Sequence, residues 1–135
     1  MASILIVEDD ALIRRLYEKV FSSEGHKVST AADGEEGLLK IKEEKPALIL
    51  LDIMMPKMDG LELLERIKAD PEIADIPVVV LTNLAGTKDA ETALSKGAVK
   101  YIVKSGYKPK EIVGMVKEIL AGYTRGDIPK TASRK

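Results

Sequence analysis

The chain has 135 residues, of which 45% are hydrophobic and 32% charged, with a formal net charge of -1 and no cysteine. This length suits one domain with a sizeable core. The near-zero net charge argues against direct nucleic-acid binding. The missing cysteines exclude disulfides and thiolate metal sites. No apolar run is long enough to insert into a membrane, and we expect a cytoplasmic protein.

Five β-rich runs alternate with helical patterns along the chain. Three of these runs, ILIV, LILL and VVVL, are continuously apolar rather than alternating, which is typical of parallel strands covered on both faces. The predicted strands are Ser3–Val7, His26–Ala31, Ala47–Leu51, Ile76–Leu81 and Val99–Val103.

Helical spacing of apolar residues predicts the first helix between the first two strands. Its expected buried stripe is Leu12, Ile13, Leu16, Tyr17, Val20 and Phe21. The second helix is predicted to begin after Asp33, with Glu36 completing a capping box, and to stop before Pro46.

Three further helices follow the later strands. The third is expected to begin at Asp59, with Glu62 three residues on, the fourth to end at Gly97 as a C-cap, and the fifth to begin near Pro109. The expected buried faces are Leu61, Leu64 and Ile67 in the third helix, and Ile112, Val113, Val116, Ile119 and Leu120 in the fifth.

The resulting order is (βα)₅. Short connections and right-handed crossovers predict an α/β fold with an open, doubly wound, five-stranded parallel sheet in the flavodoxin-like order 2-1-3-4-5. We expect one domain over residues 1–122. Residues 123–135 carry four basic residues and one acid without an apolar period, which favours a flexible basic tail.

Acidic residues follow the first and third strands of this predicted sheet. Ligands bind beyond the carboxyl ends of such strands, where the strand order reverses, here between strands 1 and 3. Glu8, Asp9 and Asp10 follow the first strand and Asp52 follows the third. Clustered carboxylates repel one another, and oxygen ligands without histidine or cysteine suit Mg²⁺ or Mn²⁺.

The same edge carries the groups that phosphoryl transfer needs. A second oxygen of Asp52 would be free to act as a nucleophile and form an acyl phosphate. Thr82 ends the fourth strand and Lys104 follows the fifth, so both could stabilise phosphoryl oxygens. Taken singly, Thr82 could be a structural hydroxyl and Lys104 a solvated lysine, while Asp10 is better explained as a helix cap.

Four motifs occur together, in order: ILIVEDD, LILLDIMMPKMDG, IPVVVLTN and YIVK. The chain resembles a response-regulator receiver domain of two-component signalling, in the stand-alone style of chemotaxis proteins, from about Ser3 to Gly122. The resemblance implies that Asp52 accepts the phosphoryl group and that Mg²⁺ is held by Glu8, Asp9, Asp52 and the backbone carbonyl of Met54.

The resemblance also implies a switch. Thr82 would follow the phosphoryl group, Lys104 would contact it, and Tyr101 would change rotamer with the state of the domain. Family members usually have proline after this lysine and a small residue after the switch hydroxyl, whereas Ser105 and Asn83 stand here. We predict a trans Lys104–Ser105 bond, with the neighbouring glycine rerouting the chain.

The implied function is a switch that accepts its phosphoryl group from a sensor histidine kinase or a phosphotransfer protein and alters binding to a downstream protein target through helix 4, strand 5 and helix 5. It would catalyse only its own phosphorylation and slow dephosphorylation. One alternative is a phosphorelay intermediate that passes the group to another histidine. An aspartate-nucleophile phosphatase is disfavoured because DIMMP lacks the second acid of that motif, and a flavin carrier because the chain has one Phe and no Trp.

Overall fold

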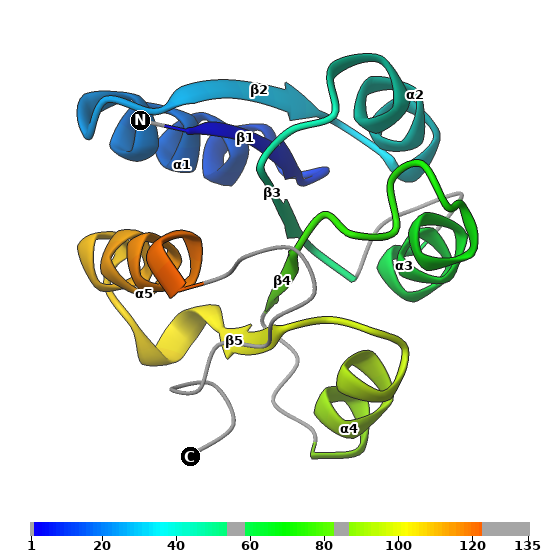
Figure 1. Cartoon of the computed structure of the whole chain (residues 1–135). Helices are drawn as coiled ribbons and strands as arrows, with labels where there is room; N and C mark the ends of the chain where they lie inside the picture. Colours follow the sequence, from blue (N-terminus) through cyan, green and yellow to red (C-terminus); the bar gives the residue numbers. More distant parts are fainter. Residues whose placement is uncertain (1, 54–58, 83–86, 123–135) are drawn as a thin grey trace.

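The computed structural model describes residues 2–53, 59–82 and 87–122 (Figure 1). The predictions for Met54, Asn83 and residues 123–135 lie outside these ranges. The elements in chain order are β1 Ser3–Val7, α1 Ala11–Ser23, β2 Lys27–Ala31, α2 Gly34–Glu44, β3 Leu48–Leu51, α3 Gly60–Ala69, β4 Val78–Thr82, α4 Thr87–Ser95, β5 Lys100–Val103, the 3₁₀ turn η1 Lys104–Gly106 and α5 Pro109–Gly122.

The five strands form one parallel sheet in the order β2-β1-β3-β4-β5, which confirms the predicted fold class. Helices α1 and α5 cover one face of the sheet and α2, α3 and α4 the other (Figure 1). Val7 is in register with Ala31 on one side and with Leu51 on the other. The central strands therefore end side by side, and the residues that follow them leave the sheet at the same edge.

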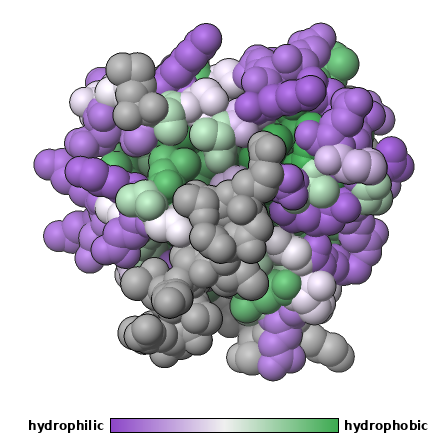
Figure 2. All heavy atoms as spheres, in the orientation of Figure 1, coloured by the Kyte–Doolittle hydropathy of each residue, from purple (hydrophilic) through white to green (hydrophobic). Residues whose placement is uncertain are grey.

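Each face of the sheet has its own core, because successive side chains of a strand point to opposite faces. Leu48 and Leu50 of β3 pack with Phe21 on the α1 and α5 side, whereas Ile49 and Leu51 pack in the core beneath α2, α3 and α4. This double coverage explains the continuously apolar strands. On the face drawn in Figure 2, hydrophilic side chains cover most of the coloured surface, with smaller hydrophobic areas between them.

The helix ends follow the predicted capping chemistry. The Asp33 carboxylate accepts a hydrogen bond from the Glu36 amide at 2.8 Å, as in a capping box, but Glu36 Oε1 accepts from the Ala32 amide, one residue before the N-cap, at 2.8 Å. Asp59 likewise caps α3, and Gly97, with φ +112°, follows α4 in the left-handed region.

The predicted apolar stripes were too wide in α1 and displaced in α3. Tyr17 and Phe21 are buried, but Leu12 and Leu16 are 77% and 45% exposed. These two leucines lie one position before Ile13 and Tyr17 on the helical wheel, about 100° away from the face that meets the sheet. In α3 the buried set is Leu63, Leu64 and Ile67, with Leu61 only partly buried.

No helix within the described ranges is long and apolar enough to cross a bilayer.

Candidate functional site

Three carboxylates meet at the carboxyl edge of β1 and β3. One oxygen from each of Glu8, Asp9 and Asp52 lies within 4.8 Å of the other two. Glu8 and Asp52 are only 4% and 7% exposed, whereas Asp9 is exposed. The Asp52 amide donates to the Val7 carbonyl at 3.0 Å, so the sheet itself fixes where the Asp52 backbone emerges.

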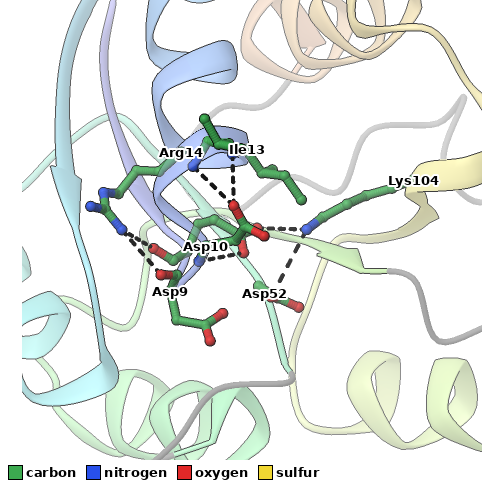
Figure 3. A network of polar contacts seen from close by, with 8 residues as sticks. Asp9, Asp10, Ile13, Arg14, Asp52 and Lys104 are labelled. Carbon is green, nitrogen blue, oxygen red and sulfur yellow. Dashed lines mark hydrogen bonds and ion pairs between the residues drawn. The ribbon is translucent and has the colours of Figure 1, made fainter.

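Lys104 reaches into this cluster from the end of β5, as Figure 3 shows. Its Nζ lies 2.5 Å from Glu8 Oε1 and 3.9 Å from Asp52 Oδ2, and its side chain is 9% exposed. The buried Lys104 ammonium is therefore the shared partner of two buried carboxylates, Glu8 and Asp52, and Asp9 lies beside them. The cluster keeps net negative charge when all three acids are ionised, and it can accept a further cation.

Burial raises the pKa of Glu8 to about 7. Loss of hydration is the largest cause, and the charge of Asp52 raises the pKa further, while the hydrogen bond from Lys104 acts in the opposite direction. Ionised Glu8 is thus unfavourable even with Lys104 beside it, unless a further cation binds.

Asp10 has a structural position one residue beyond the cluster. Its Oδ1 accepts hydrogen bonds from the amides of Leu12 at 2.9 Å and Ile13 at 3.2 Å, so it is the N-cap of α1, as the sequence predicted. Its own amide donates to Glu8 Oε2 at 3.2 Å. The start of α1 and the first acid of the cluster are therefore linked directly.

Arg14 is a component of this region that no sequence pattern indicated. Its Nη1 donates to the Glu8 carbonyl at 2.9 Å and to the Asp9 carbonyl at 3.4 Å. Figure 3 shows the guanidinium reaching back from α1 to the chain around Asp9. The arginine thus binds the backbone that carries two of the three acids.

Thr82 and Tyr101 come from the two strands beyond Asp52. Thr82 is the last residue of β4, is fully buried and is in register with Val103, the residue before Lys104. Tyr101 lies in β5, is partly buried, and packs against the core on the α2, α3 and α4 side. The fold therefore places Thr82 and Lys104 at the same edge as Asp52, with Tyr101 three residues before Lys104.

Gly60 allows α3 to begin against the backbone of the cluster. A Cβ at this position would lie 2.4 Å from the Ile53 Cα and 2.5 Å from the Asp52 carbonyl oxygen. The Gly60 amide donates to the Ile53 carbonyl at 3.1 Å. The residue without a side chain is thus required by a close approach of two backbone segments.

The turn after Lys104 confirms one prediction and corrects its reason. No peptide bond between described residues is cis, so the Lys104–Ser105 bond is trans. Gly106 does not occupy the left-handed region, however. The chain turns through the 3₁₀ turn η1 instead, with the Tyr107 amide donating to the Lys104 carbonyl at 3.2 Å.

The donor set fits a hard divalent cation such as Mg²⁺. All three groups offer carboxylate oxygens, and the exposed Asp9 leaves one side open for the waters that Mg²⁺ retains. Glu8, Asp9 and Asp52 are the described residues that would hold it. The fourth predicted ligand, the Met54 carbonyl, lies outside the described residues.

Comparison with known proteins gives consistent matches. Residues 4–117 match the family described as the response regulator receiver domain. A probable transcriptional regulator, ycf27, of Porphyridium aerugineum is 41% identical over 117 residues, which are 87% of this chain and 47% of that protein. The transcriptional regulatory protein AfsQ1 of Streptomyces coelicolor is 40% identical over 77% of this chain and 45% of its own. This chain spans less than half the length of these relatives.

Solved structures agree on the fold. A CheY-like receiver domain protein from Methanospirillum hungatei has a TM-score of 0.81 at 35% identity, covering 90% of this chain and 94% of that one. The BeF₃-activated receiver domain of RstA from Klebsiella pneumoniae has a TM-score of 0.81 at 30% identity, covering 87% and 97%.

Proposed function

This chain belongs to the response regulator receiver domain family, and from that premise we propose that it is a phosphorylatable signalling switch with Asp52 as the acceptor. The observation that carries the proposal is the constellation around Asp52. A buried carboxylate lies 3.9 Å from a buried ammonium and within 4.8 Å of two further acids. An aspartate with a purely structural role would gain no stability from two further carboxylates beside it.

The proposed reaction transfers a phosphoryl group from a phosphohistidine. An oxygen of Asp52 forms a bond to phosphorus while the bond from phosphorus to the imidazole nitrogen breaks, and the imidazole leaves with that electron pair. Lys104 and the Thr82 hydroxyl donate to phosphoryl oxygens. Mg²⁺ held by Glu8, Asp9 and Asp52 would neutralise charge on those oxygens.

The proposed donor is a sensor histidine kinase or a phosphotransfer protein of the cytoplasm. The acyl phosphate adds roughly -1.5 to -2 of charge at the edge of the sheet. Thr82 and Tyr101 would then change position and alter the surface of α4, β5 and α5, which binds a downstream protein target. Phosphorylation acts here by shifting an existing equilibrium between two conformations. Onward transfer to another histidine is the second candidate, because the same buried acyl phosphate can be a donor.

The test is intact-mass measurement after incubation with Mg²⁺ and acetyl phosphate. The wild type should gain one phosphoryl group and Asp52→Asn none, whereas Asp33→Asn, an aspartate that caps α2, should behave as the wild type. Equal labelling of wild type and Asp52→Asn would refute the assignment. Rapid multiple turnover on sugar phosphates would instead favour the phosphatase alternative.

A further inference from the structure

The segment that carries Glu8 and Asp9 lies between two regular elements. The last backbone hydrogen bond between this segment and β2 runs from the Glu8 amide to the Ala31 carbonyl at 3.0 Å. The first backbone hydrogen bond of α1 runs from the Arg14 amide to the Asp10 carbonyl at 2.8 Å. Within the described ranges, no backbone amide donates to the Glu8 or Asp9 carbonyl. Neither sheet nor helix therefore fixes these two peptide groups.

The Arg14 side chain supplies hydrogen bonds to these two carbonyls. Its Nη1 donates to both carbonyls, at 2.9 Å and 3.4 Å, from a side chain that is partly buried. Hydrogen bonds from a charged donor are stronger than those between neutral groups. One guanidinium thus ties α1 to consecutive peptide groups whose side chains are two of the three clustered acids.

We propose that Arg14 is a positioning residue for the cation site, holding the Glu8–Asp9 backbone so that both carboxylates converge with Asp52. The proposal rests on the proposed function, because it assumes that Glu8, Asp9 and Asp52 hold Mg²⁺. In this role Arg14 would act through its hydrogen bonds to the Glu8 and Asp9 carbonyls and not by contact with the cation or the phosphoryl group. It acts as the hydrogen-bonded partners outside other metal sites do, by orienting the ligands.

The positioning role predicts an effect opposite in sign to that of charge alone. Removing a positive charge near an acidic cluster lowers the repulsion that an incoming Mg²⁺ meets, so by Coulomb interaction alone the affinity should rise. Loss of positioning should lower it. Arg15, the next residue, is exposed and has the same charge. Arg15→Ala therefore measures the effect of removing a charge while the hydrogen bonds from Arg14 stay in place.

The experiment is calorimetric titration of metal-free protein with Mg²⁺. We expect Arg14→Ala to bind Mg²⁺ about 10-fold more weakly than wild type, Arg14→Lys to lie between them, and Arg15→Ala to equal wild type or bind slightly more tightly. With acetyl phosphate, Arg14→Ala should need about 10-fold more Mg²⁺ for half-maximal labelling and reach the wild-type rate at saturation. A general structural defect would lower the saturated rate instead.

Thermal unfolding of the metal-free variants accompanies the titration. If Arg14→Ala does not fold, the Mg²⁺ affinity of Arg14→Lys is the deciding measurement. An affinity of Arg14→Lys equal to that of wild type would overturn the inference. Mg²⁺ affinity in folded Arg14→Ala equal to or tighter than that of Arg15→Ala would also overturn it, while labelling of Asp52 in wild type would leave the proposed function standing. Failure of wild type both to bind Mg²⁺ and to be labelled would overturn the two together.

Discussion

The interior of β3 and its carboxyl end are buried almost equally but differ in chemistry. Leu50 is 1% exposed and Asp52, two residues later, is 7% exposed. Leu50 lies in an apolar core with other buried hydrophobic side chains, and burial of such side chains is favourable. Asp52 lies beside Glu8 and shares one lysine with it. The same sheet therefore contains a region optimised for stability and, at its edge, a region that is not.

The proposed function explains this difference. Burial of an apolar side chain lowers the free energy of the folded state without any partner, whereas burial of a carboxylate raises it unless a cation compensates. If the proposed cation site is correct, the charges at the edge are fully compensated only when a cation is bound. Substitutions in the interior should therefore cost stability, and those at the edge should mainly change metal binding and phosphorylation.

The largest effect is expected from the interior. Leu50→Ala should lower the free energy of unfolding by about 2–5 kcal/mol, because it removes buried methyl groups and leaves a cavity. Leu39→Ala, at a leucine of α2 that is 58% exposed, should change it by less than about 0.5 kcal/mol. Urea unfolding of both variants measures the difference, and equal losses would mean that the sheet interior is not the main source of stability.

The next effect is a pH dependence at the edge. The pKa of Glu8 is about 7 in the folded protein against 4.5 for the ordinary group. Its contribution to stability is therefore fully present below pH 4.5 and is lost as pH rises towards 7. At about 1.4 kcal/mol per pH unit, the loss is on the order of 3 kcal/mol. Unfolding of metal-free protein across this range should show it in wild type and not in Glu8→Gln.

Glu36 provides a control of opposite sign. The hydrogen bond from the Ala32 amide lowers the pKa of Glu36, so the stability it contributes is present at neutral pH and is lost as pH falls. Glu36→Gln should therefore leave the loss between pH 4.5 and 7 in place, and saturating Mg²⁺ should diminish that loss. A wild-type profile identical to that of Glu8→Gln would contradict the raised pKa.

Local patterns predicted the framework because the interactions that build it are close in sequence or periodic. Asp10 was identified as a cap since its partners lie two and three residues away, and the order of strands followed from their alternation with helices. The width of the α1 stripe was predicted wrongly, because periodicity does not say how far Leu12 stands from the sheet. Arg14 escaped detection since a hydrogen bond from a side chain to backbone carbonyls leaves no pattern of residue types.

Lys68 illustrates the same limit. Its Nζ donates to the carbonyls of Ala74 at 2.8 Å and Ile76 at 3.0 Å, on the segment between α3 and β4. Nothing in the sequence distinguishes this lysine from a solvated one. By contrast, the convergence of Glu8 and Asp52 was predictable because topology alone brings the ends of β1 and β3 together.

A third prediction compares two glycines. Gly60→Ala should lower the free energy of unfolding by about 1–3 kcal/mol, because the new methyl group meets the Ile53 and Asp52 backbone at 2.4 and 2.5 Å. It should also slow the proposed phosphorylation, since the strain falls on Asp52, the proposed acceptor. Gly114→Ala, in the exposed middle of α5 with nothing within 4 Å, should raise stability by about 1 kcal/mol. Thermal unfolding gives both signs, and a stabilising Gly60→Ala would contradict the close approach.

The smallest expected effect separates two adjacent aspartates at the edge. Asp10 caps α1, so Asp10→Ala should lower the free energy of unfolding by about 1 kcal/mol and retain most of the Mg²⁺-induced rise in Tm. Asp9 is exposed and offers a carboxylate to the cluster, so Asp9→Ala should leave metal-free stability nearly unchanged and abolish most of that rise. The rise itself is expected because Mg²⁺ binds only the folded state.

Melting curves of the two variants with and without Mg²⁺ therefore test whether stability and metal binding are carried by different residues within a single dipeptide. A larger loss of the Mg²⁺ effect in Asp10→Ala would mean that the ligand pair is Asp9 and Asp10, one position later than proposed. Equal losses in both variants would have another meaning. They would show that the helix cap and the cation site depend on one another, because the Asp10 amide donates a hydrogen bond to the Glu8 carboxylate. Stability and metal binding would then not be carried by separate residues at the start of α1.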